Sequence, residues 1–139
     1  MRKLALDLGS RTCGFAISDE LEVIAIGLDN FRFFEDDYEA VKNEVLRYMK
    51  EYKIDGIILG YPKKNDGSKS DSTYRVENFK DLLSKFIDIP IIYVDEQYST
   101  KNAEKILIAL GLTRQKRKNF KDKLAAQLIL EDYLNYYRR

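Results

Sequence analysis

The sequence predicts an α/β fold, a mixed sheet of five strands flanked by about four helices. The first 28 residues hold three short apolar runs separated by polar turns, which is typical of an antiparallel meander. The later apolar runs are continuous, and each follows a segment with helical spacing, which is typical of buried parallel strands. With 139 residues, 45% of them hydrophobic, the chain can form a real core, and we expect residues 1–139 to be one domain.

The meander is expected to span residues 3–8, 13–18 and 22–28. Gly9 to Thr12 are turn formers and join the first two strands. Asp19 and Glu20 form the next turn. Because the second strand runs back, this turn lies at the end of the sheet opposite Asp7, and we interpret both residues as turn residues.

Helices and strands alternate in the remainder of the chain. Apolar residues at helical spacing predict helices over 36–52 and 73–87, and a last helix from about 119 or 121 to 136. A further helix over 101–110 is expected from Ser99 or Thr100 as its N-cap and Gly111 at its end. Parallel strands are expected at 57–59 and 91–94, with a polar connector over 63–70. The basic segment 113–121 has no clear period, so we expect a mobile loop there. The sequence shows no internal repeat and no domain linker.

The composition excludes several kinds of site. There is no histidine, so histidine acid–base catalysis and histidine–metal sites are excluded. The single cysteine, Cys13, rules out an intrachain disulfide and lies in an apolar run, where a core position is expected. A metal site would therefore use oxygen ligands, which suit Mg²⁺ or Mn²⁺. No apolar run approaches the ~20 residues of a membrane span, and no signal-peptide layout is present, so we expect a cytoplasmic protein with no membrane partner.

Carboxylates follow or interrupt apolar segments at three distant places. Asp7 interrupts the first strand near its carboxyl end, where ligands of open α/β sheets bind. Its alternative role is to hydrogen-bond the amides of the following turn. Asp95 and Glu96 end the fifth strand, and since side chains alternate along a strand, only one of them can readily face a shared site.

Asp122 supplies the third carboxylate. It shares a helix face with Ala125, Ala126 and Ile129, and the two alanines would let this helix sit close to the sheet. Its alternative role is to complement the helix N-terminus. Three converging carboxylates without histidine are what a two-metal phosphoryl-transfer site requires, with the ions about 3.5–4 Å apart.

Basic residues are concentrated near the third acid. The net charge of the chain is only +1, but residues 101–123 hold eight bases and two acids. A local basic patch of this kind suits a nucleic-acid backbone. The expected binding residues in this segment are Arg114, Lys116, Arg117, Lys118 and Lys121.

Four stretches resemble the YqgF/RuvX family of the ribonuclease-H-like superfamily, whose members are described as Holliday junction resolvases or pre-16S ribosomal RNA nucleases. They are LDLGSRTCGFAISD (6–19), ILGYPKKNDGS (58–68), VDEQYSTKNAE (94–104) and KDKLAAQLILEDYL (121–134). All four occur in order, and the resemblance covers essentially the whole chain. It implies a ribonuclease-H-like sheet with strand order 3-2-1-4-5, in which strands 4 and 5 run parallel to strand 1.

The resemblance also implies roles for individual residues. Asp7, Glu96 and Asp122 match the family's catalytic, metal-binding acids, which favours Glu96 over Asp95. Arg11 matches a basic residue in the first loop of the family and is expected to contact phosphate. Lys63 and Lys64 follow the Gly-x-Pro turn and are expected to do likewise. The implied activity is a hydrolase with a two-metal mechanism that uses Mg²⁺ or Mn²⁺ and processes the 5′ end of pre-16S rRNA. The implied partners are precursor rRNA and the small ribosomal subunit, with the chain a monomer or weak homodimer.

The sequence departs from the family pattern at two positions. Gln97 stands where the family usually has arginine, and Tyr61 where it has leucine; neither change removes an expected metal ligand. Three other functions compete with rRNA processing: resolution of four-way DNA junctions, non-catalytic binding of RNA or the ribosome, and an actin-like ATPase. The ATPase is disfavoured because such proteins use two domains of this kind around the nucleotide.

Overall fold

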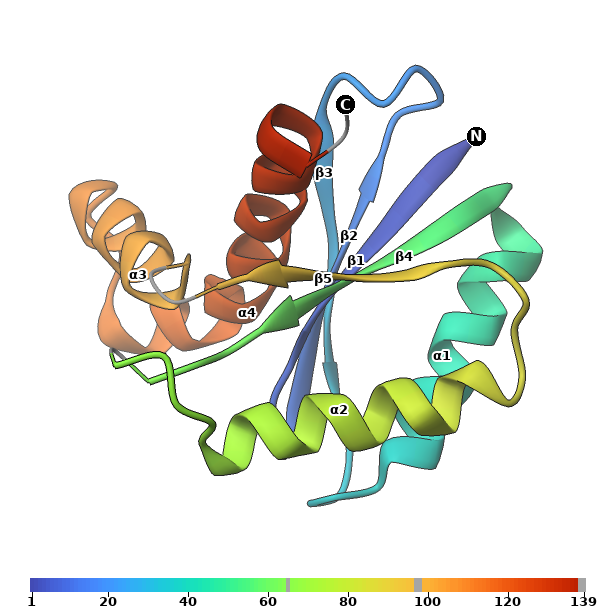
Figure 1. The fold of residues 1–139 in the computed structure, drawn as a ribbon. Coiled ribbons are helices and arrows are strands. Elements are labelled where there is room, and N and C mark those ends of the chain that lie inside the picture. Colours follow the sequence, from blue (N-terminus) through green and yellow to red (C-terminus); the bar gives the residue numbers. More distant parts are fainter. Residues whose placement is uncertain (65, 97–98, 138–139) are drawn as a thin grey trace.

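A computed structural model of the chain describes residues 1–64, 66–96 and 99–137 (Figure 1). Its centre is a five-stranded sheet with the order β3-β2-β1-β4-β5. The first three strands are antiparallel neighbours, and β4 and β5 run parallel to β1, which confirms the fold expected from the sequence. The strands are β1 (Arg2–Leu8), β2 (Thr12–Ser18), β3 (Ala25–Arg32), β4 (Ile54–Tyr61) and β5 (Ile91–Asp95).

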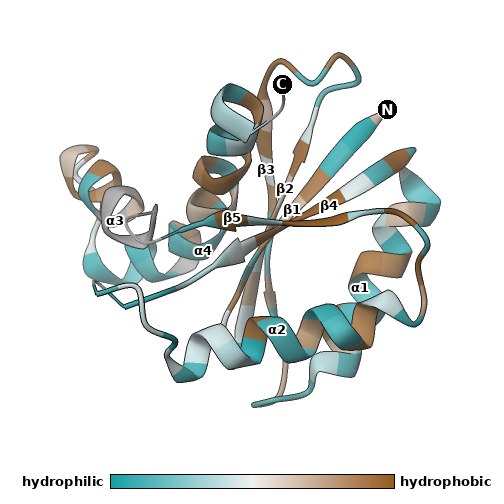
Figure 2. Ribbon diagram, viewed as in Figure 1, coloured by the Kyte–Doolittle hydropathy of each residue, from teal (hydrophilic) through white to brown (hydrophobic). Residues whose placement is uncertain are grey.

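Helices cover both faces of the sheet. Figure 1 shows α1 and α2 together on one face and α4 on the other, with α3 beside α4. Figure 2 shows hydrophobic segments of α1, α2 and α4 where these helices face the strands. The helices are α1 (Tyr38–Glu51), α2 (Asp71–Ser84), α3 (Ser99–Ala109) and α4 (Arg114–Asp132), and a π-helical turn, η1 (Tyr133–Tyr137), continues α4. No helix in these described ranges is long and apolar enough to cross a bilayer.

Alternation of side chains along β1 assigns its residues to two cores. Leu4 and Leu6 are fully buried in the core beneath α1 and α2. Ala5 points the other way and packs in the core beneath α4, where Ala126 meets the sheet. Alanines stand on both sides of this core, Ala5 and Ala16 in the sheet and Ala126 on α4, and they let the helix lie close to the first two strands. The expected close approach of this helix is therefore confirmed.

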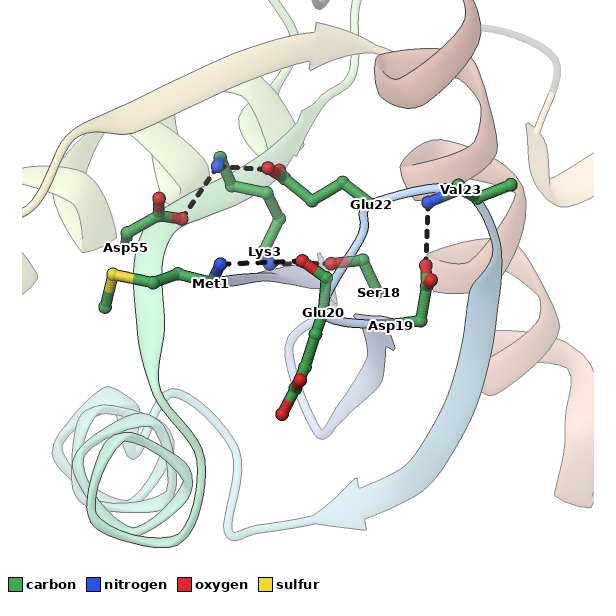
Figure 3. Close-up of polar contacts among 8 residues, drawn as sticks. All are labelled: Met1, Lys3, Ser18, Asp19, Glu20, Glu22, Val23 and Asp55. Carbon is green, nitrogen blue, oxygen red and sulfur yellow. Dashed lines mark hydrogen bonds and ion pairs between the residues drawn. The ribbon is translucent and has the colours of Figure 1, made fainter.

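A partly buried lysine, Lys3, ties three elements together at the amino end of β1 (Figure 3). Lys3 Nζ lies 2.7 Å from Asp55 Oδ1 on β4 and 2.7 Å from Glu22 Oε1 in the β2–β3 turn. Burial lowers the pKa of Lys3, but the hydrogen bonds and charges of both carboxylates outweigh this and leave the pKa raised. Cys13 on β2 is fully buried, as expected for a core residue.

The third strand begins later than expected. It spans Ala25–Arg32 and not 22–28, because residues 22–24 belong to the preceding turn. The Asp19 carboxylate accepts hydrogen bonds from the Val23 and Ile24 amides at 2.7 and 2.9 Å, and Glu22 has a positive φ of 56°. The side chains of Val23 and Ile24 are exposed, so their apolar character does not mark a strand. The fourth strand is also longer than the expected 57–59.

The basic segment 113–121 is helical, so the expected loop is wrong. Helix α4 begins at Arg114, and Thr113 caps it by accepting a hydrogen bond from the Lys116 amide at 3.3 Å. Most described side chains in its first turns are exposed. A helical segment that buries little has no reason to show apolar periodicity, which is why the sequence pattern failed there.

Candidate active site

Asp7 lies one residue before the end of β1 and faces α4. In the pairing of β1 with β2 it stands directly opposite Gly14. On the other side, β1 and β4 pair in parallel up to Leu6 and Leu59, so the next residue of β4, Gly60, flanks Asp7. The first predicted acid is thus bordered by a glycine on each neighbouring strand.

Gly14 lets α4 bring Asp122 onto the sheet. A side chain at Gly14 would overlap the main-chain carbonyl of Asp122, so only glycine permits this approach. Thr12, two residues earlier on β2, fixes the carboxylate, because its Oγ1 donates a hydrogen bond to Asp122 Oδ2 at 2.6 Å. Asp122 is therefore held by the strand that pairs with β1.

Gly60 makes the corresponding room for Glu96. A side chain at Gly60 would collide with Glu96 Oε2 and with Ile129 of α4. Val94 packs in the α4 core, and alternation then turns Glu96 to the same face while Asp95 is exposed. The structure thus brings Asp7, Glu96 and Asp122 to one edge of the sheet.

The pKa values of Asp7 and Glu96 are both raised at this edge. Burial raises the pKa of Asp7 to about 6; a proton shared with Glu96 and the charge of Lys121 oppose the rise, and Asp122 adds to it. Burial and the neighbouring Asp7 raise the pKa of Glu96 well above its ordinary value. Burial, together with the same three acids, also raises the pKa of the Cys13 thiol, which keeps it protonated. Burial and the like charges therefore both oppose the loss of protons from Asp7 and Glu96.

The three carboxylates at this edge are the type of ligand that a hard divalent cation prefers. Glu96 Oε2 is buried with no hydrogen-bond donor among the described residues. As they stand, no three such side chains within the described ranges are arranged to hold an ion. A bound cation would favour the ionised forms of Asp7 and Glu96, whose pKa values burial raises, so its binding would release protons.

The basic residues occupy different places around this edge. Four from the start of α4 line one surface hollow: Arg114, Arg117, Lys118 and Lys121. A second hollow is lined by Arg114, Gln115 and Lys118 together with Arg32 of β3. Lys116 is exposed outside both.

The other expected phosphate contacts are less concentrated. Arg11 pairs with Glu35, with Nη2 3.2 Å from Oε2. Lys63 Nζ lies 5.4 Å from the centre of the Tyr61 ring, and Lys64 is exposed on the connector after β4. Tyr61 donates a hydrogen bond to Glu77 at 2.8 Å, so the tyrosine has a structural partner here. Gln97 lies outside the described residues.

Sequence reasoning missed four residues of this edge: Thr12, Gly14, Gly60 and Arg32. The available signal was the placement of the two glycines inside otherwise apolar strands, which often marks a close backbone approach. Thr12 and Arg32 carried no such signal, because their roles depend on partners from distant parts of the chain.

Similar proteins were found by family, by sequence and by structure. The RuvX family model, described as Holliday junction resolvase, matches residues 1–136. A protein of Mesomycoplasma hyopneumoniae (strain 7448) is 46% identical over 96% of this chain and 94% of its own length. One from Ureaplasma parvum serovar 3 is 49% identical over 97% of both chains, and one from Bacillus licheniformis is 38% identical over 97% of both. All three bear the name "Putative pre-16S rRNA nuclease".

Two solved structures share the fold. The Fowlpox virus resolvase, in complex with its substrate Holliday junction DNA, superposes with a TM-score of 0.61 at 14% identity over the whole of both chains. Thermus thermophilus RuvC, in complex with a Holliday junction substrate, gives a TM-score of 0.55 at 14% identity over 96% of this chain and 94% of the other. At these identities the likeness concerns the fold alone.

Proposed function

Because the chain belongs to the YqgF/RuvX family, we propose that it is a nuclease that hydrolyses phosphodiester bonds, with the 5′ end of pre-16S rRNA as its substrate. The observation that carries the proposal is the meeting of Asp7, Glu96 and Asp122 at one sheet edge, next to the basic start of α4. The names of the similar proteins support the choice of substrate. On this proposal the chain acts in the cytoplasm, on precursor rRNA of the small ribosomal subunit.

Each residue of the edge has a distinct task in this mechanism. Asp7, Glu96 and Asp122 would hold Mg²⁺ or Mn²⁺, and the bound ions supply the charge that activates water and stabilises the leaving oxygen. Thr12 keeps Asp122 oriented through its 2.6 Å hydrogen bond. Lys121 lowers the proton affinity of Asp7 and so favours its ionised form. No protein nucleophile is needed.

The basic residues would position the substrate. Arg114, Arg117 and Lys118 precede Asp122 on α4, so phosphates bound along this helix lie next to the acids. Arg11, Lys63 and Lys64 flank the same edge from the β1–β2 turn and the β4–α2 connector and would contact phosphates further along the strand. The same helix therefore carries both the substrate contact and the third acid.

The proposal is tested by one cleavage assay with three proteins. Wild type, Asp7→Asn and the control Asp19→Asn are incubated with a structured pre-16S rRNA fragment and with Mg²⁺, Mn²⁺ or EDTA. Asp19 lies at the opposite end of the sheet, so its variant should cut like wild type. Metal-dependent cutting that only Asp7→Asn loses supports the nuclease; cutting that survives Asp7→Asn contradicts it.

A second candidate is resolution of four-way DNA junctions, which the description of the family model favours. Resolvases cut two strands at symmetric positions, so this activity requires a symmetric dimer on the junction. A four-way junction is added to the same assay, and its complex is examined by analytical sedimentation. Junction cutting by a dimer supports this candidate, and a monomer on the junction argues against it.

A further inference from the structure

We propose that Phe34 is a stacking platform for one unpaired base of the nucleic-acid strand, placed beside the candidate active site. This inference rests on the proposed nuclease function. Single exposed apolar side chains are common on protein surfaces. Phe34 differs from such residues in its position, in the rigidity of its main chain and in the hollow that it shares with Arg32.

Phe34 lies at the same edge of the sheet as the three acids. It follows β3, which runs parallel to β1, and it comes two residues after Arg32. Arg32 pairs with Thr12 in the sheet, and Thr12 holds Asp122. Two further hydrogen bonds tie this segment to the β1–β2 turn: Phe33 N–H to Arg11 O and Asp36 N–H to Ser10 O, both 3.0 Å.

The main chain around Phe34 is held in one conformation. The carbonyl of Phe34 accepts a hydrogen bond from the Asp37 amide at 2.9 Å. Asp36 has a positive φ of 62°, and its carboxylate accepts a hydrogen bond from Tyr38 Oη at 2.8 Å. Arg75 of α2 in turn donates to that hydroxyl at 2.9 Å. A segment fixed in this way loses little conformational entropy when a ligand binds.

The ring of Phe34 is uncovered, whereas the neighbouring rings of Phe31 and Phe33 are packed against the core. Phe31 and Phe33 are stacked with centroids 6.1 Å apart and contribute to the core beneath α1. Phe34 is 86% exposed. The three rings line an apolar surface hollow together with Asp37. A flat, uncovered ring beside an apolar hollow suits a nucleobase, because every base has a π-face.

Arg32 joins this aromatic hollow to the basic one. It lines the hollow with Phe34 and also the hollow with Arg114 and Lys118. A nucleotide that crosses the end of β3 can thus place its phosphate against the α4 side and its base against Phe34. The reverse orientation would bring phosphate close to Asp37, which like charge disfavours. The arrangement selects an unpaired base, since a duplex keeps both faces of its inner bases stacked.

Binding of two RNA hairpins tests the inference. One hairpin is blunt, and the other carries a 5′ single-stranded extension with 2-aminopurine at its unpaired positions. Affinity is measured by fluorescence anisotropy in EDTA, which prevents metal-dependent cleavage, and stacking by quenching of 2-aminopurine. Both probes are also made as DNA, to distinguish the two sources of an unpaired base.

Wild type should bind the extended hairpin more tightly and quench its fluorescence. Phe34→Ala should lose about tenfold or more in affinity for the extended probe, stay within about twofold for the blunt probe, and no longer quench. Phe34→Trp should keep both properties. The matched control is Phe86→Ala, an exposed phenylalanine after the last turn of α2. Because Phe34 is exposed, its alanine variant should melt like wild type.

Three outcomes overturn the inference. They are a Phe34→Ala variant that binds the extended probe like wild type, an equal loss for both probes, and a Phe34→Leu variant that quenches as well as Phe34→Trp. Cleavage by wild type and Asp7→Asn is assayed separately. Asp7-dependent cleavage with no effect of Phe34 refutes the platform and leaves the nuclease standing. A Phe34-dependent preference without any cleavage supports the platform and counts against the nuclease.

Discussion

Replacing Asp7 by asparagine should make the metal-free protein more stable while it removes cleavage. The pKa of Asp7 is raised from 3.8 to about 6, and one pKa unit corresponds to about 1.4 kcal/mol. The buried negative charge therefore costs up to about 3 kcal/mol at neutral pH. Because Asp7 keeps some contact with solvent, we expect asparagine to recover about 1–3 kcal/mol, or roughly 3–10 °C in melting temperature.

The pH dependence of this gain has a definite sign. A carboxyl whose pKa is raised by folding stabilises the fold fully below its unfolded pKa, here 3.8, and this contribution is lost as the pH rises through about 6. Wild type should therefore lose stability relative to Asp7→Asn between pH 4 and 7, and the two should converge near pH 4. Mg²⁺ should raise the melting temperature of wild type much more than that of the variant.

Urea denaturation followed by circular dichroism, in EDTA at pH 4.5 and 7.5, measures the effect. The matched control is Asp19→Asn, whose effect should have the opposite sign. The hydrogen bonds from Ile24 and Val23 lower the pKa of Asp19, so its ionised form is the one that folding favours. An Asp7→Asn variant that is less stable than wild type at pH 7.5 would refute the electrostatic reasoning.

Three further predictions concern other parts of the structure. Gly60→Ala should displace Glu96 and reduce cleavage at least tenfold while the fold is retained, which kinetics together with circular dichroism would show. Lys3→Met should destabilise the protein by about 1–3 kcal/mol in urea without a change in cleavage, and an effect on cleavage would contradict the separation of the two ends. This destabilisation should be complete up to pH 10.5 and shrink at higher pH, as the pH rises toward the raised pKa of Lys3 and the wild type loses the charge that pairs with both carboxylates. Arg114→Ala and Lys118→Ala should each weaken RNA binding and lower the salt slope by about one; an unchanged slope would exclude a phosphate contact.

The acids were the predictable part of this site. Asp7 stands out because an unpaired charge inside an apolar strand is costly to bury. This signal is visible in the residues directly around Asp7. The choice between Asp95 and Glu96 was not local, because alternation shows that the two side chains diverge but not which face the site uses. The fold selects Glu96 over Asp95, because Val94 packs beneath α4 and alternation then turns Glu96 to the same face.

The neighbours of the acids could not be predicted from the sequence. Thr12 and Asp122 are 110 residues apart, and nothing in the sequence around Thr12 indicates a carboxylate partner. The helical start of α4 was hidden for a different reason, since apolar spacing reports burial and its first turns bury little. Thr113 was the remaining local signal, and a single capping residue before a basic run is a weak one.

The contact of α4 with Gly14 has a consequence for how this protein can change over generations. Where two main chains touch, no rotamer can absorb an added atom, so the height of Asp122 above β2 is set by covalent geometry. Substitutions on the outward face of α4 leave that height unchanged and can accumulate. An added methyl group on the inward face, at Ala125 or Ala126, would lift the whole helix and move the acid with the basic residues. We therefore expect the inner face of α4 to vary least among relatives, even at positions that never touch substrate.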